Sequence, residues 1–187
     1  MKNPYLYGYL PLITILLFSL TFGMYAVSES LQLFQVIGVY SGLREFVSDL
    51  ELRILLLIVF VTLFFMLFSA LKLVGETIHE LGMLLFSKDL DGTTVHQARS
   101  GYLILLVGAI CSAFVIQSFV MLIGVFALTI CIYFVYVVYK MSHYLSIGGT
   151  VGLLIFELCL WMVLIFLLAY VILKLYNGIL ASLPFTQ

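Results

Sequence analysis

Long apolar stretches separated by short polar ones make up most of the chain. Helical apolar runs of about 20 residues match the roughly 30 Å hydrocarbon core of a bilayer. Backbone groups in hydrocarbon must be bonded within their own segment, and these runs are too long and too evenly apolar for barrel strands. We therefore expect an all-α polytopic membrane protein, one integral membrane domain over residues 1–187 built as a bundle of five transmembrane helices at about 9–27, 54–74, 102–116, 119–139 and 150–173.

Residues 28–50 follow a different pattern from the spans on either side. Polar and apolar residues alternate here at helical spacing: Glu29, Gln32 and Gln35 against Leu31, Phe34, Val36 and Ile37. Such an amphipathic pattern is typical of a helix that leaves the membrane or lies in its interface. Ser41-Gly42 interrupts the pattern, and the charged residues between Arg44 and Arg53 indicate that the chain is exposed to water there. We predict an amphipathic outer segment here.

Small residues share two neighbouring faces of the span at 102–116: Gly101, Gly108 and Ser112 on one, Ala109 and Ala113 on the other. Small residues at such spacings let helices approach closely in lipid. Gln117-Ser118 is the only polar interruption before the next span. The sequence therefore predicts a tight antiparallel hairpin of 102–116 and 119–139.

Composition agrees with the membrane class. Hydrophobic residues make up 65% of the chain and charged residues 9%, and the mean hydropathy is +1.27. The net charge of −1 and the absence of any charge run exclude a nucleic-acid footprint. Three cysteines lie in apolar runs without C-x-x-C spacing, so they favour packing over a disulfide framework or a metal site: Cys111, Cys131 and Cys159.

The lysines and arginines predict the orientation. With five spans, one side holds five of them and the other three: Lys2, Lys72, Lys88, Arg99 and Lys140 against Arg44, Arg53 and Lys174. Cytoplasmic loops carry the excess of positive charge. We expect a multi-pass protein of the bacterial inner membrane with a cytoplasmic N-terminus.

The stretch Gly75–Gly92 contains fragments of a protease signature. His79-Glu80 opens the zinc motif H-E-x-x-H, and the triplet ending at Gly92 resembles the L-D-G element of intramembrane metalloproteases. The motif needs a second histidine four residues after the first, but Met83 stands there, and a thioether is a poor zinc ligand. A polar stripe on a helix that exits the membrane is the favoured interpretation.

All three histidines fall on the predicted cytoplasmic side. With one neighbouring carboxylate they form a weak set of candidate ligands for a divalent metal: His79, Glu80, His96 and His143. No pair has diagnostic spacing, so ordinary surface histidines are the favoured interpretation. We expect no catalytic residue and no cofactor.

Glu157 lies about seven residues inside the last span, roughly 10 Å along a helix. A charged carboxylate at the centre of a span costs about 2.5–3.5 kcal/mol on insertion scales, so it is expected to face the bundle and find a partner. We predict an intramembrane polar site in which Glu157 contacts Lys72, with His79 as the second choice. Its role is either an interhelical clamp, which we favour, or a proton or cation site.

Four segments together resemble one family of small membrane proteins: "GYLPLITILLFS", "FFMLFSALKLV", "LLFSKD" and "KLYNGILASLP". They are similar to the uncharacterised YufK-type membrane proteins of Bacillus and relatives, and they are spread over nearly the whole chain. The resemblance implies a bacterial inner-membrane protein and carries over no activity and no site residues.

Three classes of function fit these features. The favoured one is a non-enzymatic accessory or partner-binding membrane protein, with the lipid bilayer and either a membrane protein or a second copy of the chain as partners. The alternative is a small transporter or substrate-capture subunit that uses an intramembrane carboxylate. A metal-dependent membrane hydrolase ranks third because its motif is broken at Met83.

Overall fold

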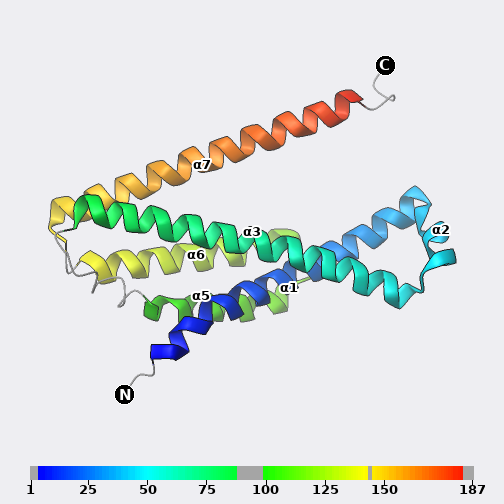
Figure 1. Cartoon of the computed structure of the whole chain (residues 1–187), viewed down its shortest axis with the longest axis horizontal. Helices are drawn as coiled ribbons and strands as arrows, with labels where there is room; N and C mark the ends of the chain where they lie inside the picture. The colour runs from blue at the N-terminus through cyan, green and yellow to red at the C-terminus, as the bar shows by residue number, and fades with distance from the viewer. Residues whose placement is uncertain (1–3, 88–98, 143–144, 183–187) are drawn as a thin grey trace. The chain divides into compact units, whose positions relative to one another are not determined.

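The structure is a computed structural model that describes residues 4–87, 99–142 and 145–182. All regular structure in these residues is helical, as predicted (Figure 1). The elements in chain order are α1 (Pro4–Ile37), α2 (Val39–Phe46), α3 (Asp49–Phe86), η1 (Arg99–Gly101), α5 (Tyr102–Ser112), η2 (Ala113–Val115), α6 (Phe119–Ser142) and α7 (Ile147–Ser182).

Four of these helices are long and apolar enough to cross a membrane: Gly8–Ile37, Asp49–Phe86, Phe119–Ser142 and Ile147–Gly178. The fifth predicted span is shorter, because α5 has 11 residues and η2 adds 3. Its length is about 22 Å, against roughly 30 Å of hydrocarbon. Helix length therefore supports four crossings and does not confirm the fifth.

Serine residues mark where three of the long helices begin. Ser48 and Glu51 form a capping box before α3: the Ser48 N–H donates to Glu51 Oε2 at 2.9 Å and the Glu51 N–H donates to Ser48 Oγ at 3.4 Å. Ser118 Oγ accepts the Met121 N–H at the start of α6, and Ser146 Oγ accepts the Gly149 N–H at the start of α7. Each hydroxyl satisfies a backbone donor that has no partner within its helix.

Contacts within the chain group it into two compact units, so the single domain over 1–187 stays a prediction. The first unit contains Met1–Gly75 and Asp89–Met141, and the second contains Glu76–Lys88 and Ser142–Gln187. The helix α3 is continuous and contributes to both units.

In the first unit, phenylalanine rings from α1, α3 and α6 pack together. Phe22 lies 5.3 Å from Phe68 and 6.0 Å from Phe126 between ring centroids, in edge-on geometry. Phe18 and Phe22 are buried, with Ala109 of α5 in the same cluster. Such tilted ring pairs add about 0.5–1.5 kcal/mol each beyond the apolar area they bury.

The predicted hairpin of α5 and α6 is present. A Cβ atom on Gly108 would lie 2.1 Å from Thr129 Oγ1, so only glycine allows this close approach. At the other end, Ser100 Oγ and Tyr136 Oη lie 2.7 Å apart. The helix α5 also meets α1, where the buried Thr21 and Ser112 hydroxyls are 3.0 Å apart.

The predicted amphipathic outer segment contains a turn and a short helix in the first unit (Figure 1). Gly38 ends α1 with φ of +81°, a left-handed conformation that favours glycine. The Tyr40 hydroxyl of α2 donates to Asp49 at the start of α3, and this bond raises the pKa of the Tyr40 phenol. Arg53 Nε donates to the same carboxylate at 3.1 Å.

Candidate functional site

The second unit is built on a close antiparallel contact of α3 and α7. A Cβ atom on Gly82 would lie 2.4 Å from Cδ1 of Leu153, whose side chain is fully buried. In return, a Cβ atom on Gly152 would lie 2.5 Å from the Phe86 ring, and one on Gly149 would lie 2.9 Å from the Phe86 carbonyl oxygen. Each helix thus receives a large side chain of the other in a notch made by glycine.

This packing sets the register that joins His79 and Glu157. Leu153 lies opposite Gly82, so one turn further along α7 meets one turn back along α3. At that level His79 Nδ1 lies 2.5 Å from Glu157 Oε1. Glu157 is 3% exposed and His79 is half-buried.

The two atoms, His79 Nδ1 and Glu157 Oε1, lie within hydrogen-bonding distance. A neutral imidazole donates its Nδ1–H to the carboxylate, and a protonated imidazole forms an ion pair with it. With a neutral imidazole the pair carries one negative charge, on the carboxylate. Protonation of the imidazole makes the pair neutral overall. A buried carboxylate without such a partner is strongly unfavourable.

Our first prediction for the partner of Glu157 was Lys72, and the structure shows the second choice, His79. The prediction ended the membrane span at Val74 and treated the rest of the helix as leaving the membrane, whereas Glu157 meets α3 in that continuation, which reaches Phe86. The turn of α3 that meets Glu157 is therefore two turns beyond Lys72. Lys72 itself belongs to the first unit.

The candidate metal ligands do not form a set in the described residues. Glu80 is exposed, and Met83, at the position where the protease motif needs histidine, is buried. His96 and His143 lie outside the described residues. Residues 4–87, 99–142 and 145–182 hold no group of three or more His, Cys, Asp or Glu side chains arranged to hold a metal ion.

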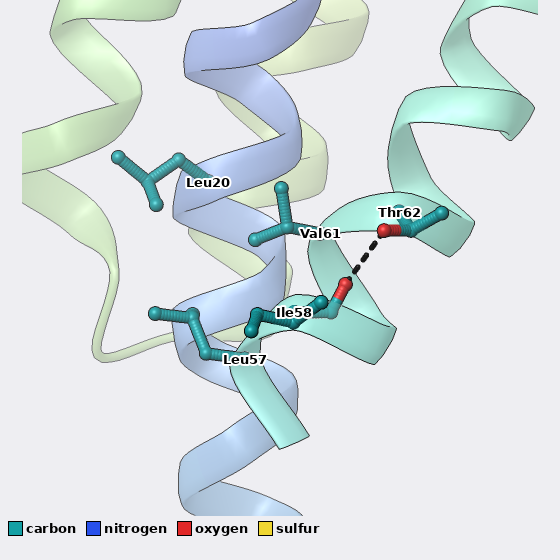
Figure 2. A pocket seen from close by; sticks show the side chains of 5 residues that line it. All are labelled: Leu20, Leu57, Ile58, Val61 and Thr62. Carbon is teal, nitrogen blue, oxygen red and sulfur yellow. Dashed lines mark hydrogen bonds between the residues drawn. The ribbon is translucent and has the colours of Figure 1, made fainter. Parts of the chain in front are cut away.

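Two shallow hollows are lined by residues other than His79 and Glu157. The first, of about 280 Å³, is a groove of the first unit between α1 and α3, lined by Leu20, Leu57, Ile58, Val61 and Thr62 (Figure 2). Its only hydroxyl, on Thr62, points back to its own helix and donates to the Ile58 carbonyl oxygen at 2.7 Å (Figure 2). The second, of about 320 Å³, lies at the start of α7 in the second unit and is lined by Ser142, Leu145, Ile147, Thr150 and Val151.

Sequence reasoning missed the glycine notches of the second unit. Gly149 lies just before the predicted span at 150–173, and Gly82 lies in the stretch Gly75–Gly92 that was interpreted as an exiting helix. The available signal was the spacing of Gly149 and Gly152, which places both on one side of a helix. Small residues at such spacing mark helix contacts in membranes.

Comparisons with known proteins agree with the membrane class. The chain is 38% identical over 184 residues to the uncharacterized membrane protein YufK of Bacillus subtilis (strain 168), covering 98% of this chain and 100% of the relative. No solved structure matches the chain. Residues 27–184 match the model of a family of unknown function, DUF5366. The chain therefore belongs to the DUF5366 family, and it is similar to a membrane protein, YufK.

Proposed function

We propose that this chain is a non-enzymatic accessory protein of the bacterial inner membrane that binds another membrane protein through its lipid-facing helices. The observation that carries the proposal is the contact of Glu157 with His79. The two side chains are hydrogen-bonded inside a close contact of α3 and α7, and neither residue lines either of the two hollows above. A clamp of this kind stabilises a helix pair and needs no substrate.

Five crossings are part of the proposal, although α5 with η2 is short. Gly101 at the start of α5 packs against Tyr133 and Tyr136 in the last turns of α6, and Gly108 packs against Thr129. The two helices are therefore antiparallel, and α5 begins level with the end of α6. This pairing supports a path for α5 through most of the thickness that α6 crosses.

The second unit supports the same count independently. Phe86 at the end of α3 packs against Gly149 and Gly152 at the start of α7. The chain after α3 and the chain before α7 then lie on one side of the membrane. An even number of crossings must separate them, and α5 with α6 supplies two. The distribution of lysine and arginine favours a cytoplasmic location for that side and for the N-terminus.

The exposed surface of the first unit favours a partner within the bilayer. Of the most apolar 18-residue window of α6, 17% is buried, against 44% for that of α1. The groove between α1 and α3 offers an apolar, concave surface without a free hydroxyl (Figure 2). In lipid, such shape matching is the main source of helix association.

Photo-crosslinking in native membranes tests the partner role. A benzophenone side chain at Ile58, inside the groove, is expected to yield one discrete protein adduct that mass spectrometry identifies. The matched control is the same group at Val120 of α6, which is exposed and does not line the groove. Lipid adducts alone at both positions would contradict the proposal.

One observation favours a second function, which is proton or cation transport. A carboxylate and an imidazole that share a proton inside a span are the groups that membrane proton relays use. The test compares ion flux into liposomes for the parent chain, Glu157→Gln and the control Glu80→Gln, whose side chain is exposed. Flux that only Glu157→Gln abolishes, with the fold retained, would favour transport over the accessory role.

A further inference from the structure

The tip of the first unit, where α1 turns into α2, carries apolar side chains that its own core leaves uncovered. Val36 is 85% exposed and Phe46 is 86% exposed. Ile37 and Val39, on either side of the Gly38 turn, are also exposed. These four residues, three beside the Gly38 turn and one at the end of α2, are called the tip row below.

Tyr40 and Leu43 fix the orientation of α2. Leu43 and Tyr40 pack against a small cluster of Val27, Leu31 and Leu52. The Tyr40 hydroxyl is bonded to Asp49, as described above. Because α2 is tied at these points, the side of the helix that carries the tip row has a defined direction.

The tip row continues the apolar face of α2. Val39, Leu43 and Phe46 are spaced i, i+4 and i+7, so they share one side of the helix. Leu43 packs against the cluster of Val27, Leu31 and Leu52, and Val39 and Phe46 extend beyond that cluster. Ser41, Arg44 and Glu45 occupy the opposite, polar side and are exposed.

The level of the tip relative to the bilayer follows from the cluster. Leu31 of α1 packs with Leu52 of α3, and charged Glu51 and Arg53 flank Leu52, so the hydrocarbon ends near this level. Gly38 follows Leu31 by seven residues, about 10 Å along the helix. The headgroup layer extends roughly 5–7 Å beyond the hydrocarbon on each side. The Gly38 turn therefore lies at the outer edge of the headgroup layer, and α2 leads back to Asp49, which is three residues or about 4.5 Å from Leu52 along α3 and lies within that layer.

We propose that the tip row and α2 form a lipid-docking surface, with the apolar row inserted among the phospholipid headgroups and the Ser41, Arg44 and Glu45 side facing water. The partner is a lipid surface because the row continues directly from membrane-embedded α1 and α3 and sits at headgroup level. An amphipathic helix with these features is the type that lies in the plane of the interface. The proposal applies to an accessory protein and to a transporter alike.

Tryptophan depth measurements test the proposal. Trp161 is the only native tryptophan, so it is replaced by phenylalanine, and single probes are introduced as Phe46→Trp and, on the polar side, Glu45→Trp. The chain is reconstituted in phosphatidylcholine vesicles with and without bromine on the acyl chains. We expect brominated lipid to quench the probe at 46 several-fold more than the probe at 45, and aqueous iodide to show the opposite order.

Val36→Trp provides a second probe in the tip row, and thermal unfolding of each variant checks that it folds. Equal iodide quenching at 45 and 46, without an effect of brominated lipid, would place the row in water and overturn the proposal. Protection of the probe at 46 from both quenchers would also overturn it, because a protein surface would then cover the row.

Discussion

The Glu157 carboxylate illustrates how one residue organises the second unit. Glu157 is buried where α3 and α7 meet, so the His79 imidazole replaces the water that would otherwise form a hydrogen bond with its carboxylate. Removing His79 leaves the Glu157 carboxylate buried without its hydrogen bond, which is more costly than removing both side chains. The pair is therefore expected to behave as a unit in mutagenesis.

A double-mutant cycle checks this coupling. Glu157→Leu or His79→Leu alone is expected to lower the free energy of unfolding by about 1–3 kcal/mol, since each breaks the hydrogen bond between the two buried side chains. The double variant is expected to recover most of that loss, because two apolar side chains fill the site. Unfolding in detergent measures all four proteins. Strictly additive losses would show that the two side chains are not coupled.

The glycine at position 108 is a second residue with an outsized role. Gly108→Ala places a methyl group 2.1 Å from Thr129 Oγ1 and 2.7 Å from Thr129 Cβ, an atom that cannot rotate away. Overpacking of this kind costs about 1–3 kcal/mol. Gly124→Ala in α6 is the matched control, since a Cβ there meets nothing within 4 Å. Equal thermal stability of the two variants would contradict the close contact of α5 and α6.

At the scale of elements, the α1–α2 turn depends on backbone conformation. Gly38 has φ of +81°, and an L-residue in this region is strained by roughly 1–2 kcal/mol. Gly38→Ala is therefore expected to destabilise the first unit by about that amount. Gly42→Ala within α2 should cost nothing, because its φ is not positive and its Cβ meets nothing within 4 Å. Chemical unfolding of both variants makes the comparison.

The helices themselves follow from the sequence more directly than their contacts do. The apolar runs predicted the positions of α1, α3, α6 and α7, and the small residues of 102–116 predicted the close approach of α5. The second span was predicted to end at Val74 with its helix running on out of the membrane, and α3 does continue, to Phe86. The packing of this continuation against α7 is what no local pattern contains.

At the scale of the whole molecule, five crossings and four crossings place two connections, at Gln117 and Ser146, on opposite sides of the membrane. In a chain whose three native cysteines are replaced by alanine, single cysteines are introduced at Gly42, Gln117 and Ser146. With five crossings, 42 and 117 are labelled from outside the cell by a membrane-impermeant maleimide, and 146 is not. With α5 outside the bilayer, position 117 would instead be protected and 146 labelled, and this result would refute the five-crossing arrangement.

The sequence by itself determined that this chain is helical and lies in a membrane, because runs of apolar residues of spanning length have one stable arrangement in lipid. It also identified Glu157 as a buried polar residue in need of a partner. The tertiary structure alone decided that the partner is His79, because the register of α3 and α7 is set by Leu153 against Gly82 and Phe86 against Gly149 and Gly152. Such notches join residues about 70 positions apart, and hydrophobic periodicity carries no information on which large side chain enters which glycine gap.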